Sequence, residues 1–79
     1  MITAYILITA RPGTEKQVVN ELSEHERIKD INVVYGEYDI IAKVDAENVE
    51  TLNDYLLKTI RPIRSIERTS TLIVALPNM

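Results

Sequence analysis

Hydrophobic residues recur at every second position in the opening segment ITAYILITA, residues 2–10. In a stretch this rich in β-branched residues, the alternation predicts a β-strand. Apolar side chains fall on both of its faces, so we expect both faces to become covered. The sequence Arg11–Pro12–Gly13 that follows has the composition of a turn and ends the strand.

A helical pattern starts at Thr14. Val18, Val19 and Leu22 are spaced three and four apart, which places them on one face of a helix. Thr14 and Gln17 have the spacing of a capping box, in which the Thr hydroxyl accepts a hydrogen bond from the backbone N–H of Gln17 and the Gln side chain reaches back. The charged residues that follow this stripe are expected to face solvent.

Two further strands meet at a glycine. The segment IKDINVVYG, residues 28–36, predicts the second strand, and residues 38–44 predict the third, with apolar side chains alternating along it. Gly36–Glu37 joins the two strands. A glycine at the first central position of a two-residue connection is typical of a type II′ hairpin turn.

The second half of the chain predicts one more helix and one more strand. The helix covers residues 46–59, with Asp45 as its N-cap and apolar residues at helical spacing, namely Val49, Leu52, Leu56 and Ile60. Pro62 stops the helix, because a residue that precedes proline is pushed out of the α conformation. The segment SIERTSTLIVAL, residues 65–76, predicts the last strand, and Pro77 ends it.

The predicted order is β-α-β-β-α-β, the ferredoxin-like split βαβ arrangement, which is an α+β fold. Right-handed crossovers place the first and third strands side by side in a four-stranded antiparallel sheet, with both helices on one face. The other face stays uncovered. We expect it to carry Tyr5, Leu7 and Ile41, or the residues that alternate with them, together with Ile73 and Ala75.

An uncovered apolar face calls for a partner. A domain of 79 residues rarely builds a strong core alone, and this chain has no cysteine with which to form a disulfide. A second copy of the chain is the simplest cover, so the sequence predicts at least a homodimer. The whole of residues 1–79 is expected to form this single domain.

Composition and charge narrow the function classes. A formal net charge of −3 argues against general nucleic-acid binding, which depends on phosphate neutralisation by Lys and Arg. No apolar run approaches the roughly 20 residues that span a bilayer. The N-terminus also lacks the basic start and the cleavage site of a signal peptide. We therefore expect no membrane contact and a cytoplasmic location.

Residues that carry catalytic or metal chemistry are scarce. His25 is the single histidine, and it falls in a charged helix with no Cys to share a metal or to act as a nucleophile. The two glycines, Gly13 and Gly36, lie too far apart for a phosphate-binding loop. There is no Trp or Phe to stack on bases. The sequence predicts no cofactor, no metal and no enzymatic activity.

Two polar stretches remain as candidate binding sites. The first is the hairpin Gly36–Glu37–Tyr38–Asp39, and the second is Thr69–Ser70–Thr71 at the start of the last strand. Asp39 can pair with an α-amino group, while hydroxyls and backbone N–H groups can hold an α-carboxylate. The alternative is structural: Gly36 sets the turn, Asp39 satisfies nearby N–H groups, and the threonines are ordinary strand residues.

Three segments in order carry a resemblance to a known family: AYILITARPGTE, VVYGEYDIIAKV and IERTSTLIVAL. The chain resembles a stand-alone RAM domain, the amino-acid-binding module of the Lrp/AsnC (feast/famine) transcription regulators. The resemblance covers nearly the whole chain. Its most specific part is the G-x-Y-D sequence formed by Gly36, Glu37, Tyr38 and Asp39.

The resemblance implies a function and an assembly. Domains of this kind pair through their sheets as dimeric α+β barrels, and the dimers form larger rings, often octamers. An amino acid effector is implied between dimers near the hairpin, with Gly36, Glu37, Tyr38, Asp39, Thr69, Ser70 and Thr71 as the ligand-binding residues. The family carries an N-terminal helix-turn-helix, whereas this sequence begins at the first RAM strand. The implied role is a sensor that modulates transcription through full-length regulators.

Two alternatives stay open. A ligand-free oligomerisation adapter would share every feature of the fold. A small enzyme of the dimeric α+β barrel type, such as a monooxygenase or a haem-degrading protein, would need a pocket built from His, Trp or Asn, and the sequence offers a single His and no Trp.

Overall fold

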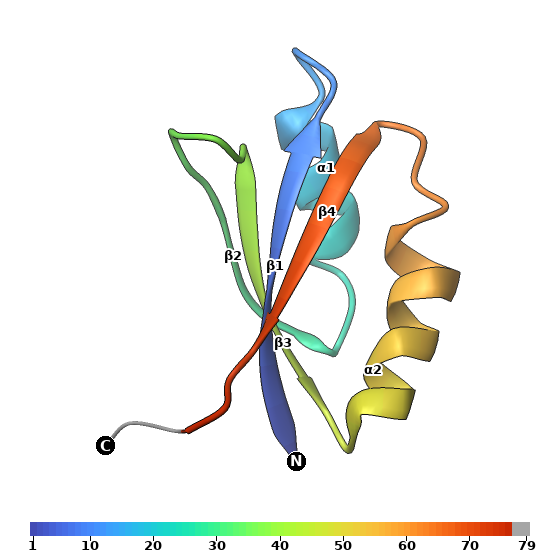
Figure 1. Ribbon diagram of the computed structural model, residues 1–79. Coiled ribbons are helices and arrows are strands. Elements are labelled where there is room, and N and C mark those ends of the chain that lie inside the picture. Colours follow the sequence, from blue (N-terminus) through green and yellow to red (C-terminus); the bar gives the residue numbers. More distant parts are fainter. Residues whose placement is uncertain (77–79) are drawn as a thin grey trace.

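The computed structural model describes residues 1–76 (Figure 1). The elements follow the order β1 (Ile2–Ala10), α1 (Glu15–Leu22), β2 (Ile28–Val33), β3 (Ile40–Ala46), α2 (Val49–Tyr55), a π-helical turn η1 (Leu56–Ile60) and β4 (Ile66–Ile73). The predicted β-α-β-β-α-β order is confirmed. The predicted stop at Pro77 lies outside the described residues.

The strands form one antiparallel sheet in the order β2-β3-β1-β4, with β1 and β3 paired in the centre as predicted. Both helices lie on one side of this sheet, which makes the fold ferredoxin-like (Figure 1). The core sits between the sheet and the helices. Its buried residues come from alternate positions of β1 and β3 and from the inner faces of the helices, chiefly Ile6, Ile8, Leu22, Ile40, Leu52 and Ile60.

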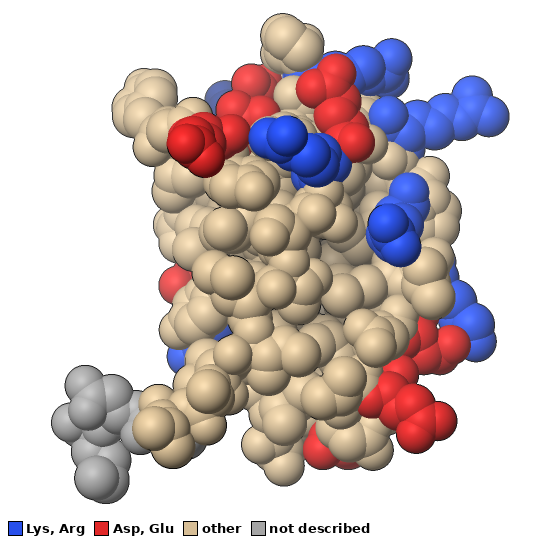
Figure 2. All heavy atoms as spheres, viewed as in Figure 1, with Lys and Arg blue, Asp and Glu red and all other residues tan. Residues whose placement is uncertain are grey.

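The opposite face of the sheet is not covered by any described part of the chain. Tyr5, Leu7 and Ile41 lie on it and are half-buried, as expected. The last strand covers Ile66–Ile73 rather than residues 65–76, so Ala75 lies beyond it, and the prediction that Ile73 lies on the open face was wrong. Leu72 stands opposite Tyr5 on the open face, whereas Ile73 stands opposite Ala4 and therefore faces the helix side. Figure 2 looks onto this face and shows an uncharged centre, with Lys, Arg, Asp and Glu mostly around the rim.

The first helix starts at Thr14 as predicted, but the predicted caps of both helices differ from the structure. No capping box forms at Thr14, because its hydroxyl donates to the carbonyl of Arg11 at 2.6 Å and α1 has no side-chain cap. The alternation of β3 continues through Ala46, so Asp45 is a strand residue and not the N-cap. Asn48 takes that role, and its side-chain oxygen accepts from the backbone N–H of Thr51 at 2.8 Å.

The hairpin keeps the predicted register but not the predicted turn. Asn32 pairs with Ile41 and Val33 with Ile40, a register that would set Tyr35 opposite Tyr38 if it were extended. The ladder stops earlier, so β2 is shorter than residues 28–36 and residues 34–39 form a longer connection. Gly36 adopts a φ of +144°, which does not suit a tight type II′ turn.

Candidate functional site

The seven predicted binding residues do not lie around one hollow. Asp39 lines a hollow beside the hairpin, whereas Thr69 and Thr71 line a groove on the helix side of β4. Ser70 stands opposite Leu7 on the open face of the sheet. A single chain therefore does not bring the two predicted stretches together around one ligand.

Asp39 is held by the central strand. Pairing between β1 and β3 ends at Ile8 and Ile40, and Asp39 extends it by one step. Its backbone N–H donates to the carbonyl of Ile8 at 2.9 Å, and its Oδ2 accepts from the backbone N–H of Ala10 at 2.9 Å. Its own carbonyl accepts from Val34 at 2.8 Å. The carboxylate is thus fixed in orientation through one oxygen, and Oδ1 makes no hydrogen bond within residues 1–76.

The hairpin hollow lies between the turn before α1 and the end of β2. Its lining consists of Gly13, Glu15, Lys16, Val33, Val34, Tyr35 and Asp39, and its volume is about 490 Å³. Three successive apolar residues form much of this wall. Val33 and Tyr35 are exposed at 54% and 106%, unusually high values for residues that continue a strand. The hollow thus joins an apolar surface to both signs of charge.

Other hairpin residues lie outside this lining. Gly36 and Glu37 are exposed at the tip of the connection, and a side chain at Gly36 would meet nothing within 4 Å. Tyr38 packs elsewhere, with the guanidinium carbon of Arg68 lying 5.6 Å from its ring centroid. This cation–π contact ties the hairpin to the start of β4.

The β4 groove runs between this strand and the end of the second helical segment. Asn53, Leu56, Leu57, Arg61, Thr69 and Thr71 line it, and its volume is about 380 Å³. The π-helical turn η1 borders the groove and is closed by the backbone N–H of Arg61 donating to the carbonyl of Leu56 at 2.9 Å. Two hydroxyls and one guanidinium give this groove donors for an anionic group.

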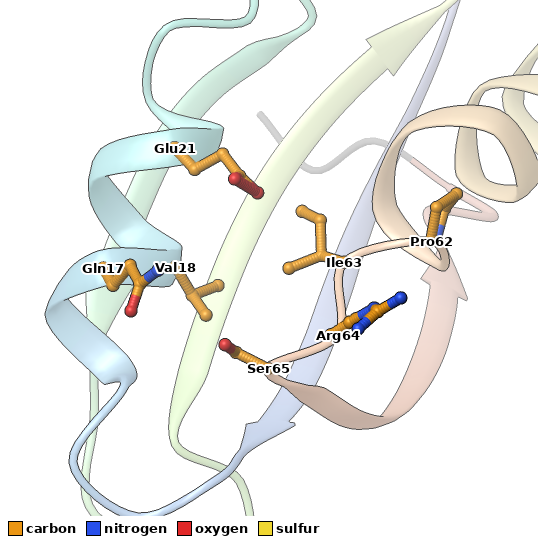
Figure 3. Close-up of a pocket in the computed structure, with 7 residues that line it drawn as sticks. All are labelled: Gln17, Val18, Glu21, Pro62, Ile63, Arg64 and Ser65. Atoms are coloured by element: carbon orange, nitrogen blue, oxygen red, sulfur yellow. The ribbon is translucent and has the colours of Figure 1, made fainter.

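A third hollow, of about 350 Å³, contains none of the predicted residues. It separates α1 from the loop that precedes β4 and is lined by Gln17, Val18, Glu21, Pro62, Ile63, Arg64 and Ser65. Figure 3 shows the Glu21 carboxylate directed into the gap, while the guanidinium of Arg64 points away from α1. The hollow offers one acidic group over the apolar side chains of Val18 and Ile63.

Sequence reasoning missed Lys16, Val33 and Val34 as residues of the hairpin hollow. A signal for the valines was present, because the apolar run Val33–Val34–Tyr35 interrupts the alternation of its strand. Lys16 carried no such signal. Its position beside the hairpin depends on the turn at Gly13, whose φ of +85° favours glycine.

Titratable groups cluster at the far end of the helices. Burial raises the pKa of the Tyr55 hydroxyl, while the nearby Arg27 opposes this shift. The pKa of Glu47 is lowered by hydrogen bonding to its own backbone and by Arg27, which donates to Oε1 at 3.1 Å. His25 packs edge-on against Tyr55. Within residues 1–76, no group of three or more His, Cys, Asp or Glu residues is arranged to hold a metal ion.

No helix within the described residues is long and apolar enough to cross a membrane.

A family model described as the Lrp/AsnC ligand binding domain matches residues 3–75. The chain belongs to this family of ligand-binding domains.

Relatives agree with this assignment, and solved structures share the fold. The transcriptional regulator FL11 of Pyrococcus abyssi is 35% identical over 71 residues, which cover 90% of this chain and 46% of FL11. A hypothetical protein of Pyrococcus horikoshii, PHS023, is 38% identical, with a TM-score of 0.91 over 98% of this chain and 93% of that chain. A feast or famine regulatory protein of M. tuberculosis, complexed with L-methionine, is 23% identical, with a TM-score of 0.83 over 98% of this chain and 52% of that chain.

The curated relatives are longer proteins. The chain spans about half the length of the curated relatives it matches, and their names describe them as HTH-type transcriptional regulators. The match lies in the ligand-binding part of this architecture.

Proposed function

We propose that this chain is an amino-acid-sensing and oligomerisation module of the Lrp/AsnC type. The observation that carries the proposal is the fixed carboxylate of Asp39, with one oxygen bound to Ala10 and the other free at the edge of an apolar hollow. Two comparisons support it. The family model is that of a ligand-binding domain, and a neighbour of the same fold is complexed with L-methionine.

The chemistry of the hairpin suits an α-amino acid. An ammonium group donates strong, charge-assisted hydrogen bonds to a carboxylate. Asp39 is already oriented by the backbone of β1, so binding an ammonium group would cost little further ordering. Gly36, Glu37 and Tyr38 belong to the proposal as the hairpin tip, which would border the ligand and contact neighbouring copies.

The second predicted stretch enters the proposal through a neighbouring copy. Thr69 and Thr71 line a groove with Arg61, where hydroxyl and guanidinium donors suit a carboxylate. A ligand held by the hairpin of one copy would meet this groove on another copy. Ser70, on the open face, is proposed to contribute to sheet-to-sheet packing instead.

Homodimerisation through the open face of the sheet is part of the same proposal. Tyr5, Leu7, Ile41 and Leu72 present apolar surface there, and the charges lie mostly around the rim (Figure 2). Burying such a face stabilises the dimer by about 25 cal/mol for each Å² of apolar surface that is removed from water. Dimers are proposed to assemble further into rings and to act on transcription together with full-length regulators of the family, without enzymatic activity.

The test is a thermal-shift panel with the twenty amino acids at millimolar concentration. A ligand at about 100 times its Kd stabilises by roughly 2.7 kcal/mol. For a domain of this size that raises Tm by about 10 to 20 °C. A shift with one or a few related amino acids supports the sensor. If a well-folded oligomer shows no shift with any of them, the chain is a structural adapter.

A matched pair of variants locates the site. Asp39→Asn keeps the shape and an acceptor for Ala10 but removes the charge, so the ligand shift should disappear while folding survives. Asp30→Asn removes the same charge from an exposed position on β2 and should leave the ligand shift unchanged. Equal ligand shifts in both variants would exclude Asp39 from the site.

A further inference from the structure

We infer that the hairpin hollow selects amino acids with apolar side chains, that Lys16 binds their α-carboxylate together with the groove donors of the neighbouring copy, and that Val33 and Val34 bind their side chain. This inference rests on the proposed function, since it assumes that Asp39 receives the α-ammonium group. It assigns a class of ligand and three binding residues to the hairpin hollow. This hollow is lined by acidic and basic side chains and by the apolar residues at the end of β2.

The first argument is the arrangement of charge. Lys16 and Asp39 line the same hollow, yet neither forms an ion pair within residues 1–76. Opposite charges on one hollow, held too far apart to pair with each other, are complementary to a zwitterion placed between them. Glu15 adds a second carboxylate, so the hollow has a formal charge of −1. Because of this net negative charge, binding should depend more on the ligand's ammonium group than on its carboxylate.

The second argument is the apolar surface. Val33, at the end of β2, and Val34, at the start of the connection, are exposed at 54% and 36%, although valine is among the residues most often buried. Val33 stands opposite the fully buried Ile40, and therefore faces the helix side, but α1 does not extend over it. Contiguous exposed apolar residues next to polar groups are typical of a binding surface. A ligand side chain lying against these valines would be removed from water.

The third argument is that the parts are fixed relative to each other. The backbone of Val34 donates to the carbonyl of Asp39 at 2.8 Å, so the apolar wall and the carboxylate belong to one rigid piece of the hairpin. The turn before α1 places Lys16 on the facing side, and the backbone N–H of Thr14 closes that turn by donating to Arg11 at 3.0 Å. The other hollows lack this combination. A hollow at the start of β4, with Glu67 and Arg68, has both charges but no run of apolar residues. The β4 groove has no carboxylate, and in the third hollow Arg64 points away (Figure 3).

The experiment is isothermal titration calorimetry on the full chain with L-valine, L-leucine and L-methionine, compared with L-serine, L-asparagine and L-aspartate. The apolar amino acids should bind at least tenfold more tightly, because each buried methylene is worth about a fourfold change in affinity. L-Leucinamide keeps the ammonium group and loses the carboxylate. N-acetyl-L-leucine does the reverse and should bind weakest of the three leucine compounds.

Variants assign each residue. Lys16→Gln should weaken the binding of L-leucine about three- to tenfold. It should leave the affinity for L-leucinamide unchanged, because the amide has no carboxylate for Lys16 to bind. Lys29→Gln, at an exposed position of β2, is the matched control and should change neither. Val34→Thr changes the shape of the side chain little but makes it polar. It should lower the ratio of the affinities for L-leucine and L-serine by about threefold or more.

The outcomes separate this inference from the proposed function. If no amino acid binds the wild-type chain, the proposed function fails and the inference fails with it. If amino acids bind through Asp39 but polar ones bind best, or if Lys16→Gln and Val34→Thr have no effect beyond that of Lys29→Gln, the ligand class is wrong and the sensor function stands. Equal loss of L-leucine and L-leucinamide in Lys16→Gln would likewise overturn the role of Lys16.

Discussion

Replacing Asp39 by alanine tests whether a proposed ligand residue is also a structural one. The carboxylate accepts from the backbone N–H of Ala10, a residue that is 4% exposed and that lies beyond the last pair of the β1–β3 ladder. Alanine removes the acceptor and leaves a nearly buried donor without a partner. We therefore expect Asp39→Ala to weaken folding as well as binding.

The magnitude follows from the kind of hydrogen bond that is lost. A hydrogen bond to a charged group contributes about 1.5 to 3 kcal/mol, and the half-buried setting of Asp39 favours the lower part of that range. We expect a loss of about 2 kcal/mol in the free energy of unfolding. For a domain of this size this corresponds to a fall in Tm of about 8 to 16 °C. Asp39→Asn keeps an acceptor at the same place and should lose less than about 1 kcal/mol.

The assay is thermal and urea unfolding of both variants without ligand. Protein concentration must be the same throughout, because association of folded copies raises the apparent stability. An Asp39→Ala variant as stable as the wild type would show that the Ala10 hydrogen bond contributes nothing, and the structural role of Asp39 would be refuted. Equal losses in the Ala and Asn variants would show that the charge matters and the acceptor does not.

Three further predictions concern other parts of the fold. Tyr55→Phe should raise the free energy of unfolding by about 1 kcal/mol, because the buried hydroxyl has no partner within residues 1–76. The raised pKa of Tyr55 means that the unfolded chain ionises first, so wild-type stability should fall above about pH 10 more steeply than that of the Phe variant; parallel pH profiles would contradict this. Gly36→Ala should lower the urea midpoint by an amount equivalent to about 1 to 2 kcal/mol, because φ of +144° strains any residue with a Cβ, and an unchanged midpoint would mean that the connection relaxes freely. Leu7→Lys should give a monomer by light scattering at micromolar concentration if the open face is the dimer contact, and an unaltered dimer would place that contact elsewhere.

Most of the fold could be predicted from the sequence. The order of strands and helices was predicted correctly, and residues 2–10 form β1 with the predicted bounds. Errors arose where a local signal competed with tertiary structure. Asp45 is a good N-cap residue, yet pairing of Ala46 with Ile2 keeps the chain in the sheet until Asn48 can cap α2. Thr14 has the spacing of a capping box, but its hydroxyl is used within the preceding turn.

The candidate site could be predicted less completely. The hairpin motif led to Asp39, but its bond to Ala10 joins residues 29 apart in sequence and depends on where the central ladder ends. Thr69 and Ser70 are neighbours in sequence, and the pleat of the strand sends them to opposite faces of the sheet. Lys16 joins the site only through the turn at Gly13, so nothing in its local sequence distinguishes it from other exposed lysines.

The central position of β1 has a consequence for how the chain folds during synthesis. Its partners on β3 lie 32 to 44 residues further along, from Ile8 with Ile40 to Ile2 with Ala46. Its partners on β4 lie still further along, up to Ile73 for Ala4. Since every ladder of this strand closes a long loop, folding should be slow for a domain of this size. During synthesis, β1 is an apolar strand that lacks β3 until Ala46 has been made and lacks β4 until Ile73 has been made, and chaperones have that interval in which to bind it.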